Sequence, residues 1–287
     1  MAGWTLDDIA WDRIDRSRAS PEIVSLVRAA SMVESNAADY RDYLCNVFAD
    51  DPRLCAAVAG WACEEQRHGA ALARWATLVD SGFDFDTAFR AFLDGYRIPV
   101  TATESVRGSR CGELIARCMV ETGTSSFYTA LSRATDEPVL QDICRRIAAD
   151  EFAHYAMFYR HMRRYLDAEK LGFLARLRVA LVRIAESDDD ELSYAYFAAN
   201  GRGEAYDRRY HGGLYQRAAL SYYTPGVMRK AIEMVFTAVG LNGGGLVGRT
   251  AAIAAGSILR WRQRWLARTV QARSESRSAP NSRTAAS

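Results

Sequence analysis

The sequence predicts an all-α protein built around a bundle of four long helices. Apolar residues recur at helical spacing through long segments, and no stretch of useful length alternates as a strand would. With 287 residues, of which 49% are hydrophobic and 25% are charged, the chain is large enough to bury one sizeable core. Proline and acidic residues separate the helical segments, so the helix boundaries can be located.

The first two long helices are expected at residues 21–48 and 52–79. Pro21 follows Ser20, a favourable N-cap residue, and takes the first helical position, where its missing N–H is harmless. Asp51 and the proline after it repeat this pattern and open the second helix. The serine and glycine that follow residue 80 end that helix.

A connection of about twenty residues leads to the third long helix, and a short helix is expected within it at 86–93. A connection of this length is expected to cross the bundle or to cover a site. The third long helix begins between residues 101 and 109 and ends near Ala134. Asp136 and Pro138 start the fourth, which reaches at least Leu166.

The C-terminal third carries weaker helical signals. Residues 171–186 place Leu and Val on one stripe and Arg on another, as in a helix that packs on a bundle. Further helices are expected at 225–239 and 251–266. The predicted organisation is a four-helix bundle domain at 1–187, a helical extension packed on it at 188–268, and a disordered tail at 269–287.

The segment 260–268 interleaves arginines with Trp261 and Trp265. Such a pattern is found in helices that lie on a membrane surface. It is also compatible with packing against the bundle, which we favour because the residues before it are small and only weakly amphipathic.

Composition excludes several other classes of protein. A formal charge of +2 gives no electrostatic argument for nucleic acid as a partner. The N-terminus does not read as a signal peptide, and no run of 18 or more uncharged apolar residues suggests a transmembrane segment. The six cysteines include no CxxC pair, so structural thiols in a reducing, cytoplasmic setting are expected.

Six carboxylate and imidazole residues are distributed over the four long helices. Residues three apart on a helix project from the same face, so each Glu-x-x-His motif directs two side chains to one point. Two such helices and two further helices with one Glu each form the known ligand pattern of di-iron bundles. The predicted metal ligands are Glu34, Glu65, His68, Glu121, Glu151 and His154.

The order of these residues strengthens the metal hypothesis. A single Glu precedes each Glu-x-x-His motif, by 31 residues in the first half and by 30 in the second, which indicates an internal repeat of a helix pair. Glu64 is an alternative to Glu65, because residues four apart also share a helix face. The parallel with Glu151, which alone can pair with His154 at this spacing, favours Glu65.

Four carboxylates balance the charge of two divalent ions, and oxygen ligands with imidazole suit iron or manganese. Taken singly, Glu34 or Glu121 reads better as half of a buried ion pair, and a lone Glu-x-x-His motif as helix surface. Their joint occurrence favours the metal site. The remaining histidines, His161 and His211, are expected on the surface and in a loop.

The strings WACEEQRHGAAL and ICRRIAADEFAH resemble the ligand helices of soluble acyl carrier protein desaturases, which belong to the ferritin-like superfamily. The resemblance covers roughly residues 30–166. It implies dioxygen-dependent oxidation of an aliphatic, acyl-type substrate, including one carried on acyl carrier protein, by two iron ions. It also implies a ferredoxin-like electron donor and a homodimer. Which glutamates bridge the ions is left open, and the region after Ser187 matches no part of the family.

Two further positions follow from the same resemblance. Asp150 stands directly before the second motif and is expected to hydrogen-bond a ligand imidazole. Thr124, three residues after Glu121, is expected either to pass a proton to bound oxygen or to bond to the preceding helical turn. Gly123 is unfavourable in a helix interior, which suggests close approach or a π-bulge there.

Other functions of such bundles remain as alternatives. A ferroxidase or a peroxide-scavenging protein would use the same ligands, and a helical protein with vestigial ligands would use none. A radical-generating subunit is disfavoured because Leu72 stands where a tyrosine is expected. Rubrerythrin-like peroxidases are disfavoured because the four-cysteine module that they usually carry is absent. The enzyme hypothesis predicts an apolar cavity one turn from the ligands, near Ala30, Ala38, Cys118, Met119, Ala148 and Phe158. Desaturation, hydroxylation and N-oxygenation stay open as reactions.

Overall fold

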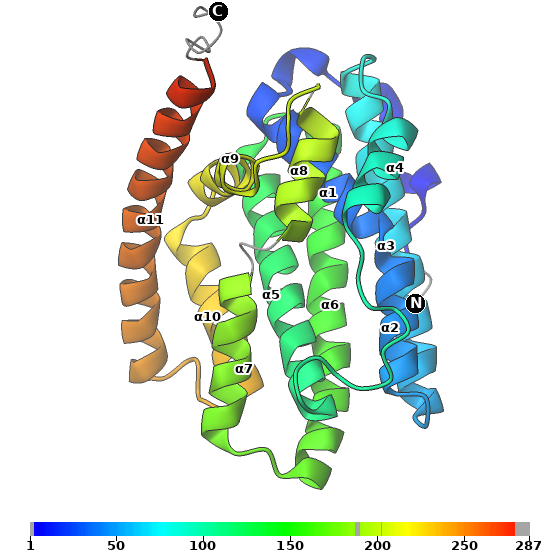
Figure 1. The fold of residues 1–287 in the computed structure, drawn as a ribbon, viewed down its shortest axis with the longest axis vertical. Helices are drawn as coiled ribbons and strands as arrows, with labels where there is room; N and C mark the ends of the chain where they lie inside the picture. Colours follow the sequence, from blue (N-terminus) through cyan, green and yellow to red (C-terminus); the bar gives the residue numbers. More distant parts are fainter. Residues whose placement is uncertain (1–2, 187–189, 202, 279–287) are drawn as a thin grey trace, which may run out of the picture.

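The predicted all-α bundle is confirmed, and every regular element in the described residues is a helix. The computed structural model of the protein describes residues 3–186, 190–201 and 203–278. Two helix pairs, α1 with α3 and α5 with α6, form the central bundle (Figure 1). Their bounds are α1 (Pro21–Ser35), α3 (Pro52–Val79), α5 (Arg110–Ala134) and α6 (Pro138–Glu169).

Further helices surround this centre. Three 3-10 helices precede α1. Helix α2 follows α1, α4 follows α3, and the remaining helices follow α6 (Figure 1). Their bounds are η1 (Leu6–Asp8), η2 (Trp11–Arg13), η3 (Arg16–Arg18), α2 (Ala37–Val47), α4 (Phe85–Gly95), α7 (Phe173–Ala185), α8 (Asp190–Asn200), α9 (Arg208–Ser221), α10 (Pro225–Val239) and α11 (Leu246–Ser278).

The helix expected at 21–48 is broken at Asn36 into α1 and α2. The break lies where α3 comes closest, at Gly69. A Cβ on Gly69 would lie 2.3 Å from Oγ of Ser35 and 2.8 Å from its backbone nitrogen, so only glycine fits there. Apolar periodicity continues through both helices, which is why the sequence pattern does not mark this break.

Side-chain caps fix the starts of the bundle helices. Asp51 accepts a hydrogen bond from the backbone N–H of Leu54, as the sequence predicts for an N-cap. Glu137, and not Asp136, caps α6 through the N–H of Leu140. Ser20 precedes Pro21 as expected but makes no side-chain cap bond.

Two apolar clusters fill the bundle, one toward each end. The first contains the buried side chains of Leu26 and Trp75, and the second those of Leu54 and Phe158. Along α3, α5 and α6, the predicted ligands lie between the segments that enter these two clusters. The bundle therefore holds a buried polar layer between two apolar layers.

The C-terminal helices cover the bundle in a way that the sequence predicts only partly. Helices α7 and α10 lie where they are expected, whereas α8 and α9 are not predicted. Helix α8 packs on α1 and α4, and α9 packs on α8 and α11. His211, expected in a loop, is a buried residue of α9.

Helix α11 also corrects the expected start of the disordered tail. The helix continues past residue 269 to Ser278, and the buried side chains of Leu266 and Val270 lie on it. An arginine-rich composition hides this contact, because one narrow apolar stripe is enough to dock a helix. The last part of the expected tail, 279–287, lies outside the described residues. Among the helices of the described residues, none is long and apolar enough to span a bilayer.

Candidate metal centre

The six predicted ligands converge in the polar layer of the bundle. Their ligand atoms fall into two groups of four, and within each group they lie within 4.8 Å of one another. All six side chains are buried, none more than 5% exposed. The first group is Glu34, Glu65, His68 and Glu151, and the second is Glu65, Glu121, Glu151 and His154.

Helical spacing explains why these side chains meet. Glu65 and His68 project from the same face of α3, and Glu151 and His154 do so from α6. Glu34 reaches the centre from the last turn of α1. The two glutamates of the Glu-x-x-His motifs belong to both groups, so they lie between the two points where an ion could bind.

Both imidazoles turn Nδ1 toward the carboxylates. Nδ1 of His68 lies 3.2 Å from Oε1 of Glu151 and 3.5 Å from Oε2 of Glu65. Nδ1 of His154 lies 3.1 Å from Oε1 of Glu65 and 3.7 Å from Oε2 of Glu121. The two rings are neighbours, with centroids 5.8 Å apart.

Several buried atoms of this cluster have no hydrogen-bond partner. They are Nδ1 of both histidines, Oε2 of Glu121 and Oε1 of Glu151. Buried polar atoms are nearly always partnered in native proteins, so four partnerless atoms facing one another need an explanation. A cation between them provides one, because each of these atoms is a metal-ligand atom. The donor set therefore fits a metal ion on the geometry of the chain itself.

The pKa values of the cluster reflect the crowding of buried charge. Burial raises the pKa of Glu34 and of Glu121 well above its usual range, and neighbouring carboxylates act in the same direction. Burial also opposes ionisation of Glu65, but its close contacts with Glu34 and both imidazoles hold its pKa well below its usual range. The imidazoles respond oppositely: burial lowers the pKa of His154, yet its carboxylate partners raise it to about 12. Bound cations would displace the protons that otherwise balance these carboxylates.

A carboxylate outside the cluster holds each imidazole by its other nitrogen. Oδ2 of Asp150 lies 3.0 Å from Nε2 of His68, and Oε2 of Glu64 lies 2.7 Å from Nε2 of His154. The expected contact of Asp150 with a ligand imidazole is therefore present. Glu64, which the sequence offers only as an alternative to Glu65, lies outside both groups of converging atoms.

Asp150 is itself held from outside the cluster. The indole Nε1 of Trp4 donates to Oδ2 of Asp150 at 2.7 Å, and Arg67 donates to the same oxygen at 3.0 Å. The Trp4 indole stacks on the ring of His68 with centroids 5.9 Å apart. Nothing in the periodicity of the sequence indicates a role for Trp4, because it precedes every expected helix.

Thr124 lies beside the cluster and makes the expected contact with the preceding helical turn, together with a contact to Glu151. Its Oγ1 donates to Oε2 of Glu151 at 2.6 Å and also lies 3.3 Å from the carbonyl oxygens of Val120 and Glu121. Gly123 next to it faces open space, and α5 continues through it without a bulge. The suspicion of close approach or a π-bulge at Gly123 is therefore wrong.

A buried arginine and a buried tyrosine complete the surroundings. Arg117, 6% exposed, lies 3.3 Å from Oε1 of Glu121 and packs over the rings of Trp61 and Phe158. Tyr128 donates a hydrogen bond to Glu34. Both lie on α5 at positions that read as ordinary bundle interior, so only the structure assigns them to the site.

A cavity of about 50 Å³ adjoins the cluster on the side of Glu34 and Glu121. Its apolar lining includes Val33, Trp61 and Val120, and its polar lining includes Thr124. The residues expected to line it are elsewhere: Ala30 and Ala148 pack in one apolar cluster, and Cys118, Met119 and Phe158 in the other, while Ala38 is not among the lining residues.

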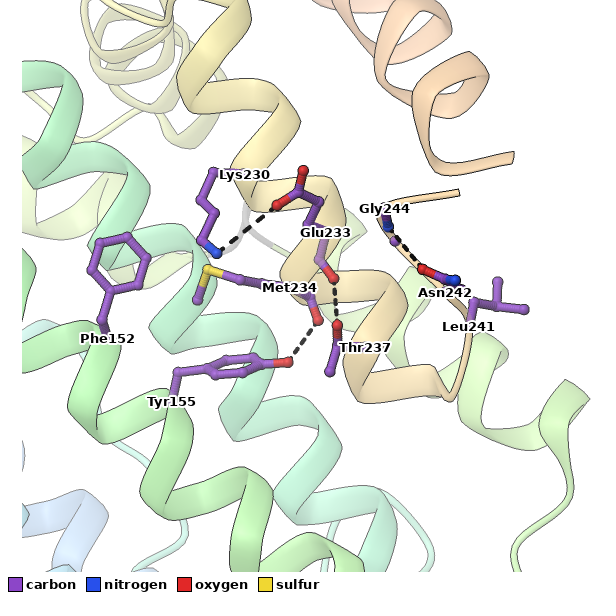
Figure 2. Close-up of a pocket in the computed structure, with 10 residues that line it drawn as sticks. Phe152, Tyr155, Lys230, Glu233, Met234, Thr237, Leu241, Asn242 and Gly244 are labelled. Atoms are coloured by element: carbon purple, nitrogen blue, oxygen red, sulfur yellow. Dashed lines mark hydrogen bonds and ion pairs between the residues drawn. The ribbon is translucent and has the colours of Figure 1, made fainter. Parts of the chain in front are cut away.

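A second, larger cavity lies between α6 and α10, away from the cluster. It has a volume of about 580 Å³, and none of the six converging residues lines it. Figure 2 shows Tyr155 donating to the carbonyl oxygen of Met234 at 2.7 Å, with Lys230 and Glu233 paired at 3.9 Å beside it. This cavity opens to the surface between well-partnered side chains.

Residues 49–183 match the family model of fatty acid desaturases. Over that segment the chain is similar to fatty acid desaturases. The segment contains α3, α5 and α6 with five of the six converging residues, while Glu34 precedes it and joins the site by geometry alone. No curated protein matches the chain. The match and the buried cluster together support a desaturase-like oxidoreductase that can bind metal.

Proposed function

We propose that this protein is a di-iron, dioxygen-dependent oxidoreductase that desaturates or hydroxylates an aliphatic, acyl-type substrate. The observation that carries the proposal is the convergence of four carboxylates and two imidazoles, with four buried ligand atoms that lack any partner. The similarity to fatty acid desaturases gives the class of reaction and of substrate. Iron fits the oxygen-rich, imidazole-containing donor set, and manganese is the alternative ion.

The proposed ligand sets follow the two groups of atoms. Glu34 and His68 would hold one ion, Glu121 and His154 the other, and Glu65 and Glu151 would be shared between them. Two reduced iron ions bound there would supply the electrons and open coordination positions that activate dioxygen.

Asp150 and Glu64 have a positioning role in this proposal. Each accepts a hydrogen bond from Nε2 of an imidazole, so Nδ1 is the nitrogen that would bind a cation when its proton is displaced. The two carboxylates thus select the tautomer that can bind a cation. They would also increase the basicity of the nitrogen that binds it.

Thr124 has a proton-handling role in this proposal. Its hydroxyl donates to Glu151 and also lines the cavity beside the cluster. We propose that Thr124 holds a proton at Oγ1 between the carboxylate and the reacting atoms in the cavity. Its bond to the preceding turn keeps the hydroxyl in position when it exchanges partners.

The cavity is the proposed place of the reacting carbon atoms. About 50 Å³ is well below the roughly 300 Å³ of a pocket that encloses a whole ligand, so most of an acyl chain would lie outside it. Arg183 of α7 and Glu191 of α8 belong to its lining. The C-terminal helices therefore help to close the cavity and exclude water from it, although the family match ends at residue 183.

The partners of the reaction are proposed on the resemblance alone. They are a ferredoxin-like electron donor and an acyl substrate, either free or on acyl carrier protein. The same resemblance proposes a homodimer in the cytoplasm. The test is anaerobic loading with Fe(II), exposure to oxygen with acyl carrier protein substrates and free fatty acids, and mass analysis of the chains. A product two mass units lighter or sixteen heavier than the substrate supports the proposal.

Other outcomes would distinguish the alternative function from the proposed one. Rapid Fe(II) oxidation by hydrogen peroxide, a shell-like assembly and unmodified acyl chains would indicate a ferroxidase or peroxide-scavenging protein instead. Glu65→Ala provides the control, because it removes a carboxylate shared by both proposed ion positions.

A further inference from the structure

The described side chains that anchor helix α11 to α9 and its surroundings lie on one face of the helix. It stands at the edge of the molecule beside α9 and α10 (Figure 1). Arg262 donates to Oε1 of Gln216 at 2.8 Å, and Gln263 donates to the carbonyl oxygen of Leu220 at 2.7 Å. Leu266 and Val270 are buried on the same side. The anchoring residues therefore fix which face of α11 turns outward.

The outward face carries large apolar side chains. Ile258 is 63% exposed, Trp261 is 65% exposed and Trp265 is 51% exposed. Their spacing of three and four residues places them along one side of the helix. At about 100° per residue, the exposed Arg264 and Arg268 fall within the same sector of roughly 120°. Trp and Arg side chains thus alternate on one exposed, convex surface.

The charge of this helix sets it apart from the rest of the chain. Residues 246–278 contain seven arginines and one acidic residue, a formal charge of +6, whereas the whole chain carries +2. Arg273 pairs with Asp207 at 2.6 Å, and the other arginines leave α11 with an excess of positive charge. A negatively charged partner would be attracted to that helix.

We propose that the outward face of α11, defined by Ile258, Trp261, Arg264, Trp265 and Arg268, docks the protein on an anionic lipid surface. Indole rings are favoured at the boundary between headgroups and acyl chains, because one part of the ring is apolar and the N–H needs a polar partner. Arginine side chains beside them pair with lipid phosphates. This combination is the pattern of helices that lie in a membrane interface.

The shape of the surface favours lipid over a protein partner. A stable protein complex buries roughly 800 Å² on each partner, more than the exposed parts of two indoles and one isoleucine supply. A fluid lipid surface adapts to a narrow convex ridge, whereas a protein partner would need a matching groove. This inference does not depend on the metal centre, so either can fail without the other.

The test is flotation of the full chain with vesicles of phosphatidylcholine alone and of phosphatidylcholine with one quarter phosphatidylglycerol. We expect binding to the anionic vesicles only, a blue shift of tryptophan fluorescence on binding, and weaker binding at high salt. Arg264→Gln with Arg268→Gln should weaken binding roughly twenty-five-fold, at about fivefold for each charge. Trp261→Ser with Trp265→Ser should weaken it by at least about tenfold.

Two control pairs make the test specific. Arg53→Gln with Arg163→Gln removes two exposed arginines from α3 and α6, and Leu174→Ala with Leu181→Ala removes exposed apolar side chains from α7. Both pairs should bind vesicles like the unaltered chain, and circular dichroism should report an unchanged fold for all four variants. Equal loss in the controls, unchanged binding of the α11 variants, or binding of an acidic carrier protein without any vesicle binding would overturn the proposal.

Discussion

The carboxylate of Asp150 on α6 hydrogen-bonds Nε2 of His68 on α3 at 3.0 Å. The reverse pairing also exists, because Glu64 on α3 holds Nε2 of His154 on α6 at 2.7 Å. Each of these acids directly precedes the glutamate of its own Glu-x-x-His motif. Helix α6 therefore orients the imidazole of His68 on α3, and α3 orients that of His154 on α6. Both Nδ1 atoms face the centre of the bundle.

This crosswise pairing predicts the metal affinity of two variants. Asp150→Asn and Glu64→Gln keep the size of the side chain but remove the charge that orients the imidazole. We expect each to bind Fe(II) roughly ten to a hundred times more weakly than the unaltered chain. Competitive titration against a coloured chelator measures the affinity. Glu104 is an exposed acid outside the bundle helices, so Glu104→Gln serves as the control. Asp150→Asn and Glu64→Gln variants that bind Fe(II) as tightly as this control would contradict the pairing.

Thr124 allows a test of proton handling that leaves the ligands in place. Thr124→Val keeps the shape of the side chain and removes the hydroxyl that donates to Glu151. We expect unchanged iron content and a rate of product formation lower by roughly a hundredfold, the usual contribution of a positioned proton donor. Thr124→Ser should recover most of the rate. A valine variant with the unaltered rate would show that the hydroxyl is only structural.

The contacts of Glu137, which is not one of the six converging residues, predict that its removal destabilises the protein. Its fully buried carboxylate accepts the indole N–H of Trp75 and the backbone N–H groups of Leu140 and Asp15. In Glu137→Ala these donors lose their partner, so the free energy of unfolding should fall by roughly 2 to 4 kcal/mol. Denaturant unfolding measures it. Asp136→Ala, one residue earlier and exposed, should leave the stability nearly unchanged.

Asp51 predicts a dependence of stability on pH. Burial opposes its ionisation, but hydrogen bonds from Leu54 and Tyr165 and the charge of Arg164 hold the pKa of Asp51 below its usual range. A pKa lowered by folding stabilises the protein above the unfolded value of about 3.9, and that stability is lost as the pH falls through the folded value.

Asp51→Asn should therefore lower the free energy of unfolding by on the order of 1 kcal/mol at pH 7. The difference from the unaltered chain should shrink as the pH falls below the unfolded value and through the lowered folded value, because Asp51 then becomes neutral like the asparagine. Denaturant unfolding at several pH values measures it, with the exposed Asp94→Asn as control. A difference that stays constant with pH would contradict a role for the charge.

Spacing along the chain explains why the centre of the fold could be predicted. Two Glu-x-x-His motifs at helical spacing, each thirty or so residues after a single Glu, require converging helices whatever their exact ends. Proline at the first helical position marks Pro52, Pro138 and Pro225, and at each of them the observed helix begins where it is expected.

Contacts between distant segments explain what could not be predicted. The break at Asn36 depends on the approach of Gly69, and the role of Glu64 depends on an imidazole from another helix. Trp4 contacts Asp150 across 146 positions of the chain, which no local pattern records. The same holds for the end of α11, where burial of Val270 outweighs a polar composition.

The iron content of the loaded protein tests the central claim most directly. After anaerobic loading with Fe(II) and desalting, elemental analysis should find two iron ions for each unaltered chain. Glu65→Ala should hold neither ion tightly while circular dichroism reports intact helices, because Glu65 belongs to both groups of ligand atoms and the apolar clusters lie outside them. One ion or none in the unaltered chain, or two in the variant, would contradict the account.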